Sequence, residues 1–288
     1  MLVGQIHGDE RYSAIVEPNL YSNAIFQPGV SYTDKYEVAD AFAAKVAKVG
    51  VGAYTDPSTG VGDYSHEEAT DELITIPYNN CFKESKKMYN IQMSSVGYNM
   101  GEENLAVAIN KVRVRKDRAG VACLVQEGTV SSVVDASTAA TLKANVLAVK
   151  KELMDDDANP TVAICTNEFY TTMLSIANNE FTSDVKNFVS QEGQVGRWLG
   201  ILWIPTSILN LASAKYYDNT GSLQVVDFSD IEFVMYDADA FSILGNVTDN
   251  GLYDGHPTFN GVAAQNELYA GFKVTNPKRA RVKKVTIS

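Results

Sequence analysis

Histidine is the side chain best suited to acid–base chemistry near neutral pH, and the sequence contains His7, His66 and His256. His66 stands beside two glutamates, but no second histidine lies at the spacing that a helical zinc site requires. The chain also lacks a Gly-x-Ser-x-Gly nucleophile motif and a Cys-x-x-Cys pair. The sequence therefore predicts no catalytic residue and no metal site, and we expect a protein that is not an enzyme.

The glycine-rich segment 50–64 contains two beginnings of a phosphate-binding loop. Residues 50–52 and 60–62 both read Gly-Val-Gly, but neither copy is followed by the third glycine of G-x-G-x-x-G or by Gly-Lys-Ser/Thr. A helical pattern does not begin directly behind either copy. We interpret the segment as the tip of a hairpin and expect no nucleotide cofactor.

An acidic segment resembles the start of a calcium-binding loop. Asp155, Asp157 and Asn159 match the first three ligand positions, but Pro160 stands where a glycine must turn sharply. The closing position is Thr166 rather than the bidentate glutamate that calcium requires. We interpret these acidic residues as a solvated helix end, and we expect no cofactor anywhere in the chain.

The composition is that of an ordinary globular protein, with 288 residues, 45% hydrophobic and 20% charged. The net charge of −11 argues against tight DNA binding, which depends on neutralising phosphates. No stretch approaches the roughly 20 apolar residues that cross a bilayer, and the start lacks the basic and apolar regions of a secretory signal. Cys81, Cys123 and Cys165 are few and far apart, so we expect small buried side chains rather than disulfides.

Two basic runs are the remaining candidates for nucleic-acid contact. One lies between Arg113 and Arg118 at the expected end of a helix, and the other spans residues 278–284. Charge runs are usually solvated faces, and we favour that interpretation for both. In the second run, Ala280 and Val282 are expected to face inward from an edge strand whose lysines discourage further pairing.

The first third of the chain predicts parts that depend on a neighbour. Residues 1–35 are polar and turn-rich, which suits an extended arm laid over another surface. Residues 36–49 show a short helical pattern, and residues 72–78 alternate like a half-buried strand. Extended stretches around the glycine-rich turn indicate a protruding hairpin with little core of its own.

The clearest helix is predicted over residues 103–118. Leu105, Ile109 and Val112 form one apolar stripe, Glu103 lies at the favourable first turn, and Gly120 is the expected stop. A second helix is expected from residues 137–138 to 153, a buried strand at 161–165, and a third helix from residue 167. Strands are expected at 201–204, 223–228, 231–236 and 268–275. This mixed order favours the α+β class.

Taken in order, these segments resemble the major capsid proteins of tailed bacteriophages. Residues 60–65 (Gly-Val-Gly-Asp-Tyr-Ser) resemble the glycine-aspartate-tyrosine signature at the tip of that family's extended loop. Glu103 falls where the family often opens its long "spine" helix, and residues 141–170 resemble its helix–strand–helix unit. Residues 196–207 resemble its glycine-spaced segment, and residues 268–274 resemble its closing strand.

The resemblance implies an N-terminal arm (1–35), an extended loop (45–82), a peripheral domain with the spine helix (83–130 and 250–288) and an axial domain (131–249). It implies subunits that contact one another through the loop at Gly60, Gly62, Asp63 and Tyr64 and form hexamers and pentamers of an icosahedral shell. Scaffolding and portal proteins are implied partners, with weak, non-specific contact to packaged double-stranded DNA and no membrane. The expected location is the virion capsid, assembled in the bacterial cytoplasm.

Two other functions remain open at this point. The shell of an encapsulin nanocompartment resembles the same fold and holds enzymes instead of DNA. A soluble enzyme is the less favoured reading, because 35 acidic residues allow chance carboxylate pairs that a sequence cannot exclude.

Overall fold

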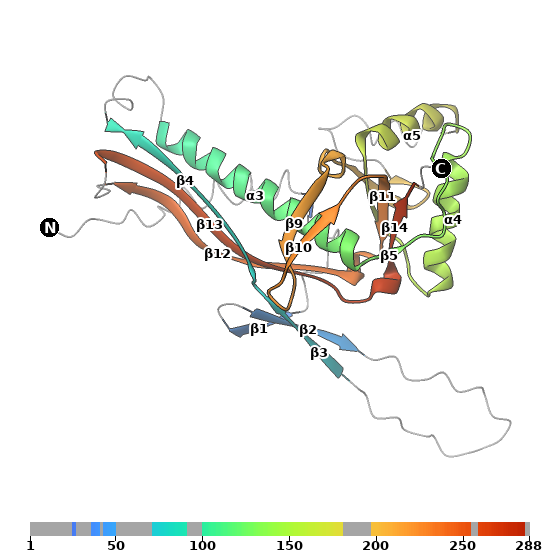
Figure 1. The fold of residues 1–288 in the computed structure, drawn as a ribbon, viewed down its shortest axis with the longest axis horizontal. Coiled ribbons are helices and arrows are strands. Elements are labelled where there is room, and N and C mark those ends of the chain that lie inside the picture. Colours follow the sequence, from blue (N-terminus) through green and yellow to red (C-terminus); the bar gives the residue numbers. More distant parts are fainter. Residues whose placement is uncertain are drawn as a thin grey trace, which may run out of the picture.

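The computed structural model describes residues 25–26, 36–40, 43–49, 71–90, 100–180, 197–254 and 259–285. These residues form a body at one end, a long arm built from a sheet and a helix, and a small sheet that leaves the junction between them (Figure 1). The mixture of helices with mostly antiparallel strands confirms the α+β class.

The body contains a six-stranded mixed sheet covered by two helices. In sheet order its strands are β5 (Thr129–Val130), β14 (Ala280–Lys284), β11 (Ile231–Tyr236), β6 (Val162–Cys165), β8 (Ile201–Pro205) and β7 (Arg197–Trp198). The helices are α4 (Leu142–Asp155) and α5 (Asn167–Glu180). Trp203 is fully buried, and its ring lies 5.4 Å from that of Phe169 and 5.6 Å from that of Phe233. These aromatic side chains form the centre of the core between helices and sheet.

Helix α4 begins at Leu142, later than the predicted start at residues 137–138. The reason is that Ser137 does not cap the helix, because its hydroxyl and its amide both donate to Glu232 on β11. The predicted buried strand and the third helix are confirmed as β6 and α5.

The arm consists of a long three-stranded antiparallel sheet with α3 lying along one face (Figure 1). Its strands are β12 (Phe241–Asp254), β13 (Gly261–Val274) and β4 (Asn80–Tyr89), and α3 spans Met100–Glu127. At one end of the arm, Leu105 and Ile109 pack with Met88 and Ala264. Near the body, the other half of α3 joins a larger core.

Helix α3 is longer than predicted, because Gly120 does not stop it. A Cβ atom at Gly120 would lie 2.8 Å from Cε2 of Phe26, so the glycine provides room for a packed aromatic ring inside a continuing helix. The basic run therefore lies in the middle of α3 and not at its end, where Glu127 accepts from the amide of Val274.

The predicted helix over residues 36–49 is wrong. This segment forms β1 (Tyr36–Asp40) and β2 (Ala43–Val49), which pair with β3 (Asp71–Pro77) in an antiparallel sheet that we call the hairpin root. Ala44 lies opposite Ile76 and Val46 opposite Ile74. Pairing with a distant strand thus overrides the helical preference of the alanines and lysines.

A two-stranded ribbon, β9 (Ser213–Tyr217) and β10 (Leu223–Asp227), lies across α3 near the body (Figure 1). Short 3-10 turns occur at Ile208–Asn210, Ala238–Ala240 and Pro277–Arg279. Strand β14 lies within the body sheet, so part of the segment 250–288 is paired with strands of the segment 131–249. Within the described residues, no helix is long and apolar enough to cross a membrane.

Candidate assembly interface

The loop residues predicted to contact neighbours, Gly60, Gly62, Asp63 and Tyr64, lie outside the described residues. The structure instead fixes where that loop starts and ends. Strands β2 and β3 pair in register down to the last described residues, Val49 opposite Asp71. The predicted hairpin is therefore present at its base, while the role of its tip stays a prediction.

The hairpin root is attached to the rest of the chain by a small apolar cluster. Ala44, Val46, Ile76 and Tyr78 pack together with Leu244 from β12. Burial of Ile76 is complete even though the cluster contains few large side chains. The root is thus attached to the long sheet through a few buried apolar side chains.

One glycine allows this attachment. A Cβ atom at Gly271 on β13 would lie 2.6 Å from the carbonyl oxygen of Pro77 and 2.7 Å from Cγ2 of Ile76. Any side chain at this position would therefore push the root away from the long sheet.

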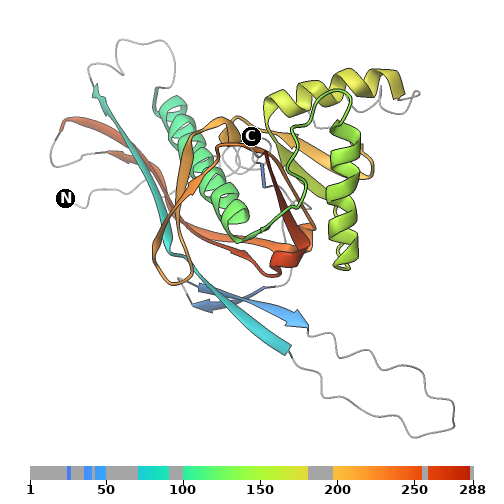
Figure 2. The same cartoon turned by 45° about the vertical axis from the view of Figure 1, so that its right-hand side comes forward.

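The root projects from the molecule instead of folding back on it (Figures 1 and 2). Strands β3 and β4 follow one another in a single long line, so the loop-bearing end of the root and the free end of the arm lie far apart. A three-stranded sheet needs a hydrophobic face to be stable by itself, and the apolar cluster of the root contains only a few side chains. The geometry of the root suits contact with another molecule.

The predicted spine residues lie on α3 as expected. Leu105, Ile109 and Val112 are buried, and Glu103 is exposed in the first turn. Their stripe faces the long sheet, where Leu105 and Ile109 belong to the small cluster near the free end. The structure brings Leu105 and Ile109 together in this cluster, which contains no residue of the hairpin root.

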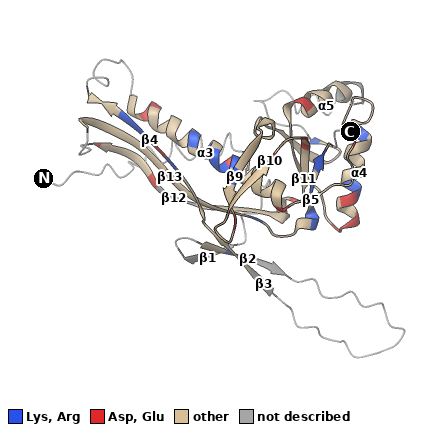
Figure 3. Cartoon of the chain, in the orientation of Figure 1, with Lys and Arg blue, Asp and Glu red and all other residues tan. Residues whose placement is uncertain are grey.

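Two basic residues of α3 make ion pairs with the neighbouring strand β4. Glu84 on β4 contacts Lys111 at 2.8 Å and Arg115 at 3.1 Å. The hydrogen bond from Lys111 lowers the pKa of Glu84 below its ordinary value. Figure 3 shows basic residues on α3 and β4 and also on the body around α4 and β14, in a chain that is acidic as a whole.

The β9–β10 ribbon presents exposed apolar side chains from a fixed position. Asn80, at the start of β4, donates to the carbonyl of Tyr217 at 2.9 Å and accepts from its amide at 2.8 Å. Tyr217 and Leu223 lie opposite one another, and with Val225 they are about half exposed. Because the backbone of Tyr217 is held on both sides, this apolar face is ordered before any partner arrives.

The turn of the ribbon is also ordered. The carboxylate of Asp218 accepts from the Thr220 hydroxyl and from the amides of Thr220 and Ser222. These bonds, led by that of the Thr220 hydroxyl, lower the pKa of Asp218 to about 2. The turn therefore keeps its charged carboxylate across the physiological pH range.

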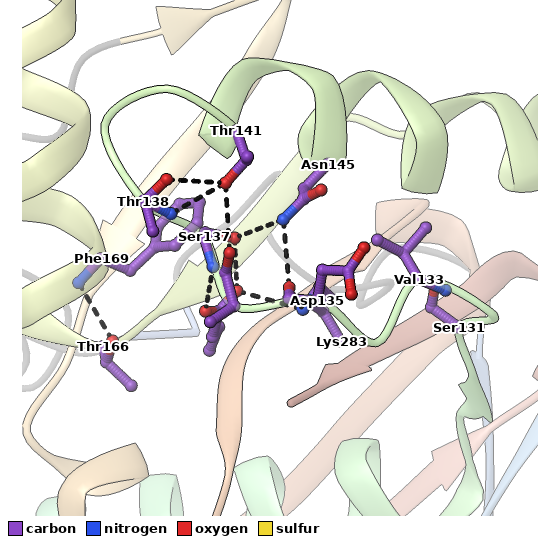
Figure 4. A network of polar contacts seen from close by, with 12 residues as sticks. Ser131, Val133, Asp135, Ser137, Thr138, Thr141, Asn145, Thr166, Phe169 and Lys283 are labelled. Atoms are coloured by element: carbon purple, nitrogen blue, oxygen red, sulfur yellow. Dashed lines mark hydrogen bonds and ion pairs between the residues drawn. The ribbon is translucent and has the colours of Figure 1, made fainter. Parts of the chain in front are cut away.

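A buried ionic network joins the body sheet to the loop before α4 (Figure 4). Lys283 on β14 is fully buried and donates to the carbonyl of Asp135 at 2.6 Å, and its Nζ lies 3.3 Å from Glu232. Glu232 in turn holds Ser137, and Asn145 on α4 donates to the Asp135 carbonyl and to the Ser137 hydroxyl. The charge of the buried Lys283 ammonium group is therefore compensated by the Glu232 carboxylate and the Asp135 carbonyl oxygen.

Arg281, on the same strand, makes a second set of ionic contacts with α4, pairing with Asp156 and with Glu152. The prediction of a solvated edge strand is therefore wrong: β14 lies between β5 and β11, and Arg281 and Lys283 are both buried. Their ionic partners lie far away in the sequence, so no local sequence pattern predicts these contacts.

Cys123 and Cys165 are buried as predicted, and burial raises the pKa of each thiol. Cys81 is exposed on β4, so the prediction of a buried side chain was wrong for this cysteine. It lies on the solvent side of an alternating strand. Among the described residues, no group of histidine, cysteine and acidic side chains could hold a metal ion.

No protein-family model matches the sequence. No curated protein matches it either. Solved structures do: the structure entitled "Capsid structure of the Cyanophage P-SCSP1u" aligns with a TM-score of 0.62 and 11% identity, over 100% of this chain and 93% of that chain. The chain has the fold of a phage capsid protein.

Two further structures share this capsid fold. The mature capsid of bacteriophage PhiM1 aligns with a TM-score of 0.59 and 11% identity, over 100% of this chain and 93% of that chain. A virus-like particle from Pyrococcus furiosus aligns with a TM-score of 0.59 and 12% identity, over 96% of this chain and 98% of that chain. The capsid fold thus accounts for the whole chain, including the arm and the hairpin root that project from the body.

Proposed function

We propose that this protein is the shell subunit of a phage capsid, which self-assembles as hexamers and pentamers into an icosahedral container for double-stranded DNA. The supporting observation is the alignment of 100% of the chain with the cyanophage capsid structure, without a segment left over for a separate activity. The protein is a structural component and not an enzyme.

The proposal also assigns each segment of the chain to a part of the shell subunit. Residues 1–35 form an N-terminal arm, which is distinct from the arm of the long sheet and α3. Residues 45–82 form an extended loop, 83–130 and 250–288 a peripheral domain, and 131–249 an axial domain. Projecting parts with small cores are stabilised when a second copy covers them, and closed symmetry then limits the size of the assembly. The loop residues Gly60, Gly62, Asp63 and Tyr64 make the contacts with the adjacent subunit.

Contact with packaged DNA is weak and non-specific in this proposal. The net charge of −11 opposes phosphate binding, and Lys111 and Arg115 already pair with Glu84. Scaffolding and portal proteins are the further partners, and assembly takes place in the host cytoplasm before the shell becomes the virion capsid.

Removing the loop tip tests the contact between subunits. We expect deletion of residues 56–62 to abolish closed shells in electron micrographs, because the loop can no longer reach its neighbour. The unfolding free energy should change by less than about 0.5 kcal/mol, because the entropic cost of connecting two strands varies only slowly with the length of the connection. A full-length variant with Asp63→Ala and Tyr64→Ala separates the loss of side chains from the loss of length. Normal shells in normal yield from the deletion variant would contradict the proposed contact.

A nanocompartment shell is the second candidate, and the virus-like particle that aligns over 98% of its chain is the observation in its favour. The contents of purified particles distinguish the two. A phage shell produced with its packaging partners contains nuclease-protected DNA, and its gene lies beside portal, terminase and scaffold genes. A nanocompartment contains a protein cargo encoded beside the shell gene.

A further inference from the structure

Two residues of the N-terminal segment are fixed on the spine helix. Phe26 is 6% exposed, and its ring lies 5.1 Å from that of Phe241. It occupies the space that the missing side chain of Gly120 leaves on α3. This packing places Phe26 in the main core of its own chain. The sequence of residues 1–35 instead predicts an N-terminal arm laid over another surface.

The neighbouring residue is held by a buried carboxylate. Asp117 lies one turn before Gly120 on α3 and is 3% exposed, and its Oδ2 accepts from the amide of Ile25 at 3.1 Å. Its second oxygen, Oδ1, is buried and has no hydrogen-bond partner among the residues that the structure describes. An ionised carboxylate in this position therefore lacks part of the solvation that it would have in water.

Burial is the main influence on this carboxyl group and raises the pKa of Asp117, while Lys116, the Ile25 amide and Arg113 lower it by smaller amounts. Lys116 and Arg113, the two charged residues among these influences, both lie on α3 itself. Burial also lowers the pKa of the Lys116 ammonium group, while the charge of Asp117 raises it by a smaller amount.

We propose that Asp117 and Gly120 form a proton-sensitive anchor, which holds Ile25 and Phe26 on the spine helix when the carboxyl is protonated and releases them more readily when it is ionised. The anchor is a property of the single subunit and does not require the proposed function. Its use during shell assembly does rest on that function.

The direction follows from linkage. When Ile25 and Phe26 leave, Asp117 becomes hydrated and its pKa returns toward the ordinary value for aspartate. The closed anchor thus binds the proton more tightly than the open one. The proton-linked part of its stability is complete below the ordinary pKa and is lost as the pH rises through the raised pKa of the closed state.

Amide hydrogen exchange resolved to Ile25, measured on the full chain from about pH 4 to pH 8, tests the anchor across the range in which buried carboxyls titrate. After correction for intrinsic exchange, we expect protection of this amide to fall as the pH rises, by up to about tenfold per pH unit. Asp117→Asn retains a side-chain acceptor without the titration and should remove this slope. Glu103→Gln, an exposed change on the same helix, should leave it intact.

A second variant tests the packing of Phe26 on α3 independently of the charge of Asp117. Gly120→Ala places a methyl group against Phe26, and we expect it to lower Ile25 protection at every pH while the slope remains. Protection that is independent of pH in the native chain, or an equal slope in Asp117→Asn, would overturn the anchor. Both measurements can be made on unassembled subunits. A chain that forms no shell but keeps the pH-dependent protection would contradict the proposed function and leave the anchor standing.

Discussion

The body and the hairpin root bury their side chains in different ways. In the body, Trp203 and Phe233 are completely covered by helices on one side and by the sheet itself. In the root, Ile76 is just as buried, but its neighbours are the small side chains of Ala44 and Val46 and a few residues of the long sheet. The body can therefore be stable in an isolated subunit, whereas the root has few buried apolar side chains to stabilise it.

Trp203→Ala is the substitution with the largest expected effect. It removes a buried ring from contact with Phe169 and Phe233, and we expect it to lower the unfolding free energy by about 4 kcal/mol. Denaturant unfolding of the free subunit measures this loss. Leu147→Ala, on the exposed side of α4, is the control and should change little. A small effect at Trp203 would mean that the body is not the independent core described here.

Lys283→Met tests the ionic network of the body and should cost about 3 kcal/mol, because Glu232, whose side chain is only 17% exposed, loses its cation. The double variant with Glu232→Gln removes both charges and should recover part of this loss. Urea unfolding of the two variants at neutral pH provides the comparison. Equal stability of the single variant and the native chain would show that Lys283 is solvated in solution.

Ile76→Ala tests whether the hairpin root can lose stability while the body keeps its own. We expect a loss of about 2 kcal/mol in the local stability of β2 and β3, at the low end for a buried isoleucine because the cluster is small. Hydrogen exchange should show faster exchange in these strands and unchanged protection in β6 and β11. A uniform loss of protection across both regions would contradict the division into a stable body and a less stable root.

Val225→Ser should have the smallest effect, because this side chain on the β9–β10 ribbon is 59% exposed. We expect the unfolding free energy to stay within about 0.5 kcal/mol of the native value. Thermal unfolding of the free subunit measures it. A large loss would show that the ribbon contributes to the core of the single chain.

Local patterns predicted the elements whose partners lie close in the sequence. The stripe of Leu105, Ile109 and Val112 was sufficient to locate α3, and the apolar run at residues 161–165 was sufficient to locate β6. The end of α3 was missed, because a glycine in a helix costs about 1 kcal/mol and is read as a stop. What outweighs that cost is Phe26, which is far away along the chain.

The same reason explains the other errors. Residues 43–49 become a strand because β3 pairs with them across an intervening loop. Lys283 is buried because Glu232 and the Asp135 carbonyl meet it from other elements. Asp117 carries no sequence signal of its special position, since its place beside basic residues on a helix is typical of a solvated face. These properties exist only once the chain has folded.

The mass of the particles formed by the expressed chain, alone and with its scaffolding partner, tests the shell proposal most directly. Mass measurement and electron microscopy should show closed particles built from many copies in at least one of these conditions. A stable monomer under every condition, with the partner present, would contradict the proposal.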